Sequence, residues 1–365
     1  MCASENSGNT CRMTALIMAG GIGERFWPLS TPTKPKQLLP FGENGKTLIE
    51  EAVERIRPLV SEDNLWIATS ETLKPIFRNL RLCPETQILA EPFRKNTAGC
   101  IAFAVASMLA KCGDDIKNSV MAVLTADHLI KPEDKFIDAV KRIINFVSSN
   151  PLLGIIGIKP TRPDTGYGYI ESGEEISEGI YKVIKFHEKP NSEEASEYLK
   201  RGNYFWNSGM FFWKVETFLN ELRVASPQHY ESILKMREAM IQNRYDDVKE
   251  TFNSLPNISI DYALMECSSN IAMVKAEFFW DDLGSWNSLE RIFTPDDKGN
   301  VIKGEWIGCD TTNCIIYNAD KKDLTIATLG IDNIVVAVVE NVVLVMNKHN
   351  TQKIKNLLSK YYDME

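Results

Sequence analysis

The stretch LIMAGGIGERFWPLSTPTKPKQLLPF, Leu16–Phe41, joins a short apolar run to a loop that is rich in glycine, proline and cations. The apolar run is typical of a buried strand. Gly20 and Gly21 directly after it let the backbone approach a ligand closely and present N–H groups to anionic oxygens. Arg25 can bind two oxygens with its planar fork, and Lys36 adds a point charge. The stretch therefore indicates a loop that holds phosphate groups, with a surface loop of solvated charges as the alternative.

Two known phosphate-binding loops do not fit this stretch. The run Gly42–Thr47, GENGKT, is unlike a P-loop because Pro40 stands where the first glycine of that motif makes its tight turn. Gly21 and Gly23 begin a dinucleotide-binding fingerprint, but Phe26 fills the third glycine position and would block the close approach of helix and strand. The sequence therefore favours neither motif.

The composition is that of an ordinary globular protein of 365 residues, with 44% hydrophobic and 25% charged residues. The net charge of −8, with scattered Lys and Arg, argues against a dedicated nucleic-acid binder, which usually carries a basic stripe. The 8 cysteines form no C-x-x-C pair and the chain has 4 dispersed histidines, so we expect no zinc site. No apolar stretch reaches the ~20 residues that cross a bilayer, so we expect no membrane span.

The start of the chain gives an expectation about location. Residues 1–13 are polar and lack the apolar core of an export signal, so we expect a disordered extension there. Isolated cysteines in a chain without such a signal are typical of reduced thiols. We therefore expect a cytoplasmic protein.

Strand-like and helix-like segments alternate from the opening stretch to about Ile158. The run Thr47–Ile56 has helical spacing, with Thr47 as its N-cap and Glu50 three residues on. A second helix is expected over residues 96–112. The alternation predicts an α/β fold, with a Rossmann-like mixed, mostly parallel sheet and helices on both faces.

Three polar segments follow predicted strands of this sheet. They are the opening loop, the segment 91–96 and the segment 125–128. Ligands of such sheets lie beyond the carboxyl ends of the strands, so we expect these three segments to meet at one edge.

The pattern changes after Pro160, where turns and shorter strands replace the regular alternation. From about Arg291 the chain becomes rich in strands, and residues 351–362 have helical spacing. We therefore expect a large α/β domain at 14–290 and a C-terminal β-rich segment with a terminal helix at 291–365.

Seven motifs in order carry a resemblance that no single one of them would establish. They are AGGIGERFWPLSTPTKPKQ at 19–37, EPFRKNTA at 91–98, TADH at 125–128, GYGYIE at 166–171, FHEKP at 186–190, WNSGMF at 206–211 and WDDLGSW at 280–286. Together they resemble the nucleotidyltransferases that activate sugar 1-phosphates, and among these the mannose-1-phosphate guanylyltransferases. The resemblance covers roughly residues 14–347, which makes 14–290 the expected catalytic domain.

The resemblance implies that the chain transfers GMP from GTP to α-D-mannose 1-phosphate, giving GDP-mannose and pyrophosphate. The reaction joins two anions, and two unit charges ~4 Å apart repel each other by ~4 kcal/mol at an effective dielectric constant of ~20. Cations must cancel this repulsion, and alignment must replace covalent help from the protein. The family uses direct in-line attack on the α-phosphorus, assisted by Mg²⁺.

By the same resemblance, each motif supplies residues for one part of the reaction. Arg25 and Lys36 would be the catalytic residues. Nucleotide-binding residues would be Ala19, Gly20, Gly21, Glu91, Asn96, Thr97 and Asp127; sugar-phosphate-binding residues would be Gly166, Glu171, Lys189 and Asn207; the metal ligands would be Asp127 and Asp282. A carboxylate can accept hydrogen bonds from the guanine N–H groups, and carboxylate oxygens suit a hard cation.

Several of these residues also have a purely structural interpretation. Asn96 would make a good N-cap for the helix that follows it. Asp127 or Asp282, taken singly, would suit a helix cap or a turn, and we expect His128 to be structural rather than a metal ligand. We expect Lys36→Ala to lower turnover strongly with little change in thermal stability.

The sequence departs from the family at two positions. Glu24 stands where many relatives carry Thr or Ser, and Lys95 stands where relatives carry Arg, which removes a bidentate fork. The chain ends at Glu365, so the fused isomerase domain of longer relatives is not expected. The β-rich tail resembles the short β-helical segment of compact members, which often builds a dimer, so we expect a homodimer with no nucleic-acid or membrane partner.

Two other functions stay open. The same chemistry could serve another hexose or heptose 1-phosphate, or another base. A non-catalytic nucleotide-sugar sensor would usually lose the phosphate-gripping cations or the metal acids, whereas Arg25, Lys36, Asp127 and Asp282 are all present here. The sequence thus favours the enzyme over the sensor.

Overall fold

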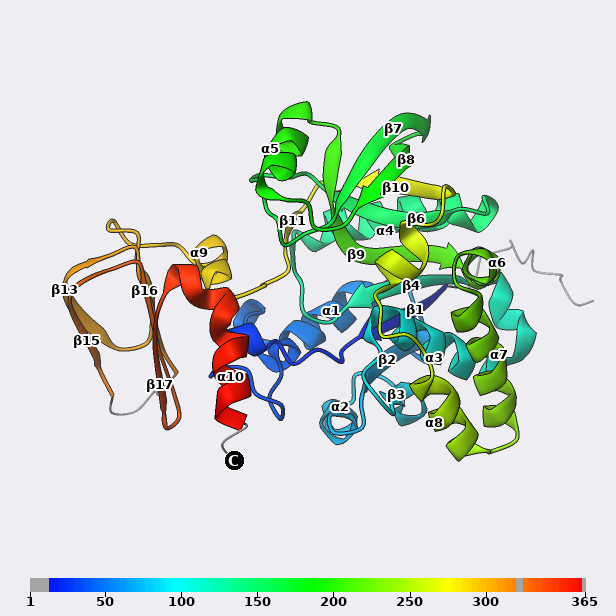
Figure 1. The fold of residues 1–365 in the computed structure, drawn as a ribbon, viewed down its shortest axis with the longest axis horizontal. Coiled ribbons are helices and arrows are strands. Elements are labelled where there is room, and N and C mark those ends of the chain that lie inside the picture. The colour runs from blue at the N-terminus through cyan, green and yellow to red at the C-terminus, as the bar shows by residue number, and fades with distance from the viewer. Residues whose placement is uncertain (1–12, 320–323, 363–365) are drawn as a thin grey trace, which may run out of the picture. The chain divides into compact units, whose positions relative to one another are not determined.

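The computed structural model describes residues 13–319 and 324–362 (Figure 1). The extension predicted over residues 1–13 lies outside the described residues, except for Met13, which begins the first strand. Within the described residues, no helix is long and apolar enough to span a membrane.

The chain divides into two compact units that do not follow the order of the sequence. The first contains the residues up to Gly20, Ala52–Ala126 and Ile130–Phe279. The second contains Gly21–Glu51, Asp127–Leu129 and the chain from Trp280 onward. The opening loop therefore belongs with the C-terminal residues, and a division at residue 291 stays a proposal.

A large mixed sheet forms the centre of the first unit (Figure 1). Its strands, in spatial order, are β3 (Ile88–Glu91), β2 (Leu65–Ser70), β1 (Met13–Met18), β4 (Val120–Thr125), β9 (Tyr204–Lys214), β6 (Leu153–Ile158), β10 (Ile271–Lys275), β8 (Ile180–His187) and β7 (Tyr169–Ser177). Pairing is parallel across β3, β2, β1 and β4 and between β6 and β10, whereas β9 and β8 run against their neighbours. The predicted mixed sheet, with most strands in one direction, is confirmed.

Helices cover both faces of this sheet, as the near-continuous apolar strands require. The helices of the chain are α1 (Leu48–Ile56), α2 (Lys74–Leu80), α3 (Asn96–Cys112), α4 (Glu133–Ser149), α5 (Ser192–Arg201), α6 (Val215–Ala225), α7 (Pro227–Ile241), α8 (Tyr245–Asn253), α9 (Leu289–Ile292) and α10 (Ile354–Tyr362). In the first unit α3 packs against α7, and α7 against α8, while α4 packs on β4, β6, β9 and β10 (Figure 1). Leu16 and Met121 share one core with the helix residues Ile101 and Met236, so this face of the sheet is buried by α3 and α7.

Local sequence signals position the first helices as expected. The backbone N–H of Thr47 donates to Glu50 Oε2 at 2.8 Å, and the N–H of Glu50 reaches Thr47 Oγ1 at 3.4 Å, which is a capping box at the start of α1. The helix predicted over 96–112 is α3. Its cap position is Lys95 rather than Asn96, because Asn96 is already the first residue of the helix despite its φ of 58°.

Short strands wound in parallel form the C-terminal part of the second unit. They are β12 (Val301–Lys303), β13 (Trp306–Thr312), β14 (Ile315–Asn318), β15 (Ile326–Asp332), β16 (Ile334–Val339) and β17 (Val342–Asn347). β12, β14 and β16 pair in parallel, β13 pairs with β15 in parallel, and β17 closes the larger sheet antiparallel to β16. Two further short strands are β5 (Leu129–Lys131) and β11 (Phe279–Asp281). The predicted β-rich tail with a terminal helix is thus present.

Candidate functional site

The opening loop of the second unit is folded back on itself so that Lys36 lies beneath its glycine turn. The backbone N–H of Lys36 donates to the carbonyl of Ile22 at 2.9 Å, and Ser30 Oγ donates to the carbonyl of Gly23 at 2.6 Å. Gly23 has a φ of +75°, and a Cβ there would overlap the side chain of Lys36. Glycine is therefore required at this position for two reasons, and the loop is an ordered structure rather than a solvated turn.

Lys36 is the central cation of this loop. Its side chain is 9% exposed, and its ammonium lies 2.6 Å from Asp127 Oδ2. The same ammonium donates to the main-chain carbonyl of Asp282 at 2.6 Å and to that of Leu283 at 3.3 Å. Three acceptors thus use the three donors of one ammonium group, and Lys36 brings together the segments that carry the two predicted metal ligands.

The charge of Lys36 sets the ionisation of its neighbour. Burial raises the pKa of the Asp127 carboxyl, but the Lys36 ammonium and His128 outweigh burial and hold that pKa below its ordinary value. Asp127 is therefore an ionised carboxylate at neutral pH, which is the form that binds a cation.

Arg25 and Glu24 lie on the short helical turn of the same loop. Arg25 Nη1 donates to Gln352 Oε1 at 3.1 Å, and Glu24 lies 3.6 Å from Lys355 Nζ. The structure therefore ties the Arg25 side of the loop to the segment that leads into α10, within the second unit. The carboxylate that replaces Thr or Ser at position 24 makes an ion pair rather than a hydroxyl contact.

Two residues beside the predicted metal ligands are structural. His128 is buried, and its Nδ1 accepts a hydrogen bond from Trp280 Nε1 at 3.1 Å. Asp281 is 2% exposed and forms a two-point ion pair with Arg291. The structural interpretation of His128 is therefore supported, and Asp281 has a partner that makes it unsuitable as a metal ligand.

The predicted nucleotide-binding residues of the first unit follow β1 and β3. The backbone N–H of Ala19 donates to the carbonyl of Ala68 at 2.7 Å, which continues the sheet. A Cβ on Gly20 would lie 3.4 Å from Glu91 Oε1, so these two strand ends meet as expected for one edge of a parallel sheet. Around Gly21 a Cβ would meet nothing within 4 Å, so the backbone there is open to a ligand.

Glu91 is a half-buried carboxyl with few donors around it. Burial raises the pKa of Glu91 to about 7, although a hydrogen bond with Cys100 and the charge of Arg94 lower it. A carboxylate in this state gains from any ligand that supplies N–H donors. The structure thus gives Glu91 the character of an acceptor that waits for a donor.

Asn96 and Thr97 make the turn between β3 and α3. Asn96 adopts a left-handed conformation, and its Oδ1 accepts from the backbone N–H of Thr97 at 2.8 Å. Thr97 Oγ1 accepts from the backbone N–H of Ile260 at 2.8 Å. The predicted base-binding turn is therefore anchored to a distant segment of the first unit.

The sugar-side residues gather around Gly168 in the first unit. The backbone N–H of Asn207 donates to the carbonyl of Gly168 at 2.8 Å, and a Cβ on Gly168 would overlap the carboxylate of Glu188. Lys189 Nζ lies 3.0 Å from Glu188 Oε1, and the Lys189 side chain is 60% exposed. Asn207 Nδ2 donates to Asp261 Oδ1 at 2.6 Å. The structure therefore brings the predicted residues Lys189 and Asn207 into one cluster.

The other two predicted sugar-side residues have different surroundings. Glu171 lies 3.8 Å from His187 Nε2, and His187 Nδ1 is 3.2 Å from the hydroxyl of Tyr198 on α5. Gly166 is exposed, and its N–H donates to Asp164 Oδ1 at 2.9 Å. Gly166 and Glu171 stay predictions, but their contacts are not those of the cluster around Gly168.

Sequence reasoning missed two acidic members of the cluster. Glu188 stands inside the motif FHEKP, so its neighbour Lys189 could have pointed to it. Burial raises the pKa of Glu188, although its hydrogen bond with Lys189 lowers it. Asp261 lies in none of the seven motifs, and only its contact with Asn207 shows that it belongs here.

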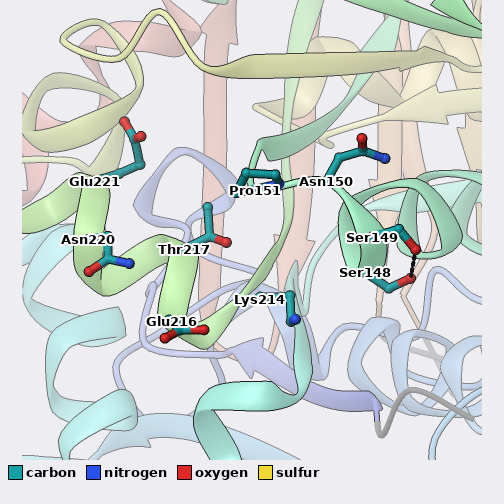
Figure 2. A pocket seen from close by; sticks show the side chains of 9 residues that line it. All are labelled: Ser148, Ser149, Asn150, Pro151, Lys214, Glu216, Thr217, Asn220 and Glu221. Carbon is teal, nitrogen blue, oxygen red and sulfur yellow. Dashed lines mark hydrogen bonds between the residues drawn. The ribbon is translucent and has the colours of Figure 1, made fainter. Parts of the chain in front are cut away.

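A separate pocket of the first unit is not a substrate site of this kind (Figure 2). Its volume is about 210 Å³, and it is lined by Ser148, Ser149, Asn150, Pro151, Lys214, Glu216, Thr217, Asn220 and Glu221. These residues precede β6 or follow β9, which runs against β6, so the pocket lies at the amino end of the parallel strands. Ligands of such sheets bind at the opposite end, and none of the predicted site residues lines this pocket.

Comparison with known proteins agrees with the geometry. Residues 14–298 match the family described as Nucleotidyl transferase. The chain belongs to the nucleotidyl transferase family. In this nucleotidyl transferase, residues 304–361 also match a MannoseP isomerase/GMP-like beta-helix domain, which corresponds to the wound strands of the second unit. The family resemblance and the fold class expected from the sequence are thereby confirmed.

Individual relatives narrow the resemblance. The chain is 35% identical to the mannose-1-phosphate guanylyltransferase RfbM of Salmonella typhimurium over 94% of its own length and 71% of that protein. It is also 35% identical to a mannose-1-phosphate guanylyltransferase of Escherichia coli, over 93% of its own length and 72% of that protein. The crystal structure named mannose-1-phosphate geranyltransferase, from Thermus thermophilus, has 33% identity and a TM-score of 0.84, covering 96% of this chain and 99% of that one.

Family membership defines the broad chemistry of this nucleotidyl transferase. Enzymes of the family take a nucleoside triphosphate and a sugar phosphate, and they generally use a divalent metal ion. The described residues contain no group of three or more His, Cys, Asp or Glu side chains close enough to hold a metal ion by themselves. This agrees with a cation that takes part of its ligands from phosphate oxygens and water.

Proposed function

We propose that the chain transfers GMP from GTP to α-D-mannose 1-phosphate, giving GDP-mannose and pyrophosphate. The observation that carries the proposal is the gathering of the Asp127 carboxylate and the Asp282 backbone around the ammonium of Lys36. This arrangement occurs in a chain whose relatives are named mannose-1-phosphate guanylyltransferase. The sugar phosphate attacks the α-phosphorus of GTP in line, and pyrophosphate leaves.

Lys36 and Arg25 serve the phosphates in this proposal. Lys36 is held in a buried seat by three acceptors, so little conformational entropy remains to be lost when it meets an anion. A fixed positive charge in a site of low dielectric stabilises the negative charge that develops on the phosphates more than a solvated one would. Arg25, on the same loop, supplies a planar fork for two phosphate oxygens.

The residues present fit one Mg²⁺. Asp127 is ionised, and Lys36 brings its carboxylate and the Asp282 segment to a single cationic group. A site of two carboxylates completed by phosphate oxygens is typical of Mg²⁺. Asp127 and Asp282 would hold the ion, which when bound neutralises charge on the phosphates of the nucleotide.

Glu91 and the turn after it serve the base. A carboxylate accepts from N1–H and the exocyclic amino group of guanine, and these donors compensate the burial that raises the pKa of Glu91. Adenine lacks this pair of donors at the same edge, so Glu91 favours GTP over ATP. Asn96 and Thr97 shape the turn that follows.

The cluster around Gly168 serves the sugar phosphate. Lys189 offers a cation for the 1-phosphate, and Asn207 offers an amide to a hydroxyl or phosphate oxygen. Glu188 offers carboxylate oxygens that sugar hydroxyls can donate to. Gly166 and Glu171 remain further proposed contacts.

The direct test is release of pyrophosphate from GTP and mannose 1-phosphate. We expect the purified protein to release pyrophosphate with GTP, mannose 1-phosphate and Mg²⁺, and to form GDP-mannose in equal amount. Chelation with EDTA should abolish the release and added Mg²⁺ should restore it. No release above background would reject the proposal.

A panel of sugar 1-phosphates and nucleoside triphosphates separates the nearest alternative. Faster turnover with another hexose or heptose 1-phosphate would reassign the sugar but keep the chemistry. A nucleotide-sugar sensor would bind GDP-mannose tightly without turnover. The ordered seat of Lys36 beside an ionised Asp127 favours the enzyme, because a sensor has no need of either.

We further propose that the protein is a cytoplasmic homodimer. One face of the β13–β15 pair exposes Ile307 and Leu329, which are 63% and 75% exposed, so this face suits a second copy of the chain. A particle of twice the 41.3 kDa chain mass in sedimentation equilibrium would support the dimer. Cell fractionation tests the location.

A further inference from the structure

Asp261 fixes the orientation of the side-chain amide of Asn207. Asn207 Nδ2 donates to Asp261 Oδ1 at 2.6 Å, and Asn207 Oδ1 accepts from the backbone N–H of Gly209 at 2.8 Å. An ionised carboxylate only accepts and a backbone N–H only donates, so the amide cannot be turned over without losing both bonds. One N–H of the amide remains for a ligand oxygen, and its direction is set by these two partners.

The position of Asp261 is itself held firmly. It begins a π-helical turn, Asp261–Met265, in which the N–H of Glu266 donates to the carbonyl of Asp261 at 2.8 Å. Just before it, the N–H of Ile260 donates to Thr97 Oγ1 at 2.8 Å. Single π turns inside helices are frequent at functional sites. Asp261 is therefore anchored from both sides in the sequence.

Asp261 also adds negative charge to the surroundings of Lys189. Its carboxylate is close enough to influence the pKa of both Lys189 and Glu188. A sugar 1-phosphate is an anion, so the charge of Asp261 by itself opposes binding of the phosphate group. Removing that charge should strengthen binding if Asp261 acts only through electrostatics, and weaken it if Asp261 acts by holding Asn207.

We propose that Asp261 is a positioning residue that acts through Asn207 and sets the affinity for the sugar 1-phosphate. The inference rests on the proposed function, which places Asn207 at the sugar phosphate. Asp261 itself need not touch the substrate. Its contribution is to keep one amide N–H of Asn207 aimed at a ligand oxygen.

The experiment measures KM for mannose 1-phosphate and for GTP in two variants of Asp261. Asp261→Leu removes both the charge and the acceptor, whereas Asp261→Asn removes the charge but keeps an oxygen that Asn207 can donate to. We expect Asp261→Leu to raise KM for mannose 1-phosphate about tenfold or more and Asp261→Asn to change it by about threefold or less, because only the first loses the hydrogen bond. KM for GTP should change little in either variant. Asp246→Leu, an exposed carboxylate on α8 of the same unit, is the matched control.

A double-mutant cycle shows whether the effect passes through Asn207. In the Asn207→Ala background, Asp261→Leu should cause no further rise in KM for mannose 1-phosphate. Should Asp261→Leu fail to fold by its melting curve, Asp261→Ala takes its place in the same cycle.

The outcomes separate this inference from the proposed function. An unchanged or lower KM for mannose 1-phosphate in Asp261→Leu would overturn the positioning role, as would equal rises of both KM values or full additivity with Asn207→Ala. A wild-type protein without turnover would overturn the proposed function and this inference together. A selective, non-additive rise supports both.

Discussion

The two compact units differ in how their acidic side chains are satisfied. In the second unit, Asp127 already has a cationic partner in Lys36, and its pKa lies below the ordinary value. In the first unit, burial raises the pKa of Glu91, Glu188 and Asp261, although hydrogen bonds lower each of them. The carboxylate near the proposed phosphate site is thus complete before any substrate binds, whereas those near the proposed base and sugar sites are short of donors.

This difference suggests a division of labour. Charge stabilisation works best when the charges are fixed before the reaction, since no reorganisation is then needed. Recognition works best when a buried acceptor gains its donor only from the correct ligand, because a wrong ligand leaves it unpaired. The second unit has the features of the first kind of site, and the first unit has those of the second.

Lys36→Ala should break the charge-stabilising unit, with the largest effect of the variants considered. We expect turnover to fall by about 10³-fold, because a buried cation near the transferred phosphate is lost. The structure also revises the expectation of unchanged stability. The variant leaves Asp127 without its partner and removes the donor to the carbonyls of Asp282 and Leu283, so its melting temperature should fall as well.

The matched control is Lys34→Ala. Lys34 lies two residues away in the same loop but is exposed. Its removal should leave turnover and melting temperature close to those of the wild type. An equal loss of turnover in both variants would contradict the special role of Lys36, as it would indicate a general requirement for positive charge in the loop.

Glu91→Gln should sharpen the comparison from the recognition side. We expect KM for GTP to rise by about 10-fold to 100-fold, because an amide cannot accept from both guanine donors as a carboxylate does. In the wild type, KM for GTP should fall as the pH rises through about 7, where Glu91 loses its proton. The variant should show only the pH dependence of GTP itself.

The same substitution has an opposite effect on stability. Because the folded-state pKa of Glu91 is raised to about 7, the native state holds this proton more tightly than the unfolded state, and stability falls as the pH rises toward 7. Glu91→Gln should therefore gain melting temperature relative to the wild type at a pH of about 8 more than at a pH of about 5. A constant difference between the two melting curves would show that Glu91 does not titrate in this range.

Local features of this molecule were predictable from the sequence, and long-range ones were not. The capping box of Thr47 and Glu50 and the helix α3 depend on residues within a few positions of each other, so their signals stand in the sequence itself. The contact of Lys36 with Asp282 joins residues 246 positions apart, and that of Asn207 with Asp261 joins residues 54 apart. No periodicity records such pairs.

The resemblance supplied the site residues but not their surroundings. Its motifs named Lys36, Asp127 and Asp282, which the structure gathers in one unit. They gave no sign that β9 lies between β4 and β6, because periodicity predicts strands but not their order in a sheet. For the same reason the opening loop was grouped with the large domain rather than with the C-terminal residues.

Thr97→Val should have the smallest effect and tests whether base and sugar recognition share a support. Thr97 lies in the proposed base-binding turn, yet its Oγ1 accepts from Ile260 N, next to the Asp261 that holds Asn207. Valine keeps the shape but removes this acceptor, while the bond from Ala98 N to the Ile258 carbonyl at 3.4 Å remains. We expect KM for both GTP and mannose 1-phosphate to rise by about twofold to fivefold, in line with one neutral hydrogen bond. Thr97→Ser keeps the hydroxyl and should behave as the wild type. A rise in KM for GTP alone would show that the segment before Asp261 keeps its position without Thr97, and that the two parts of the recognition unit are independent.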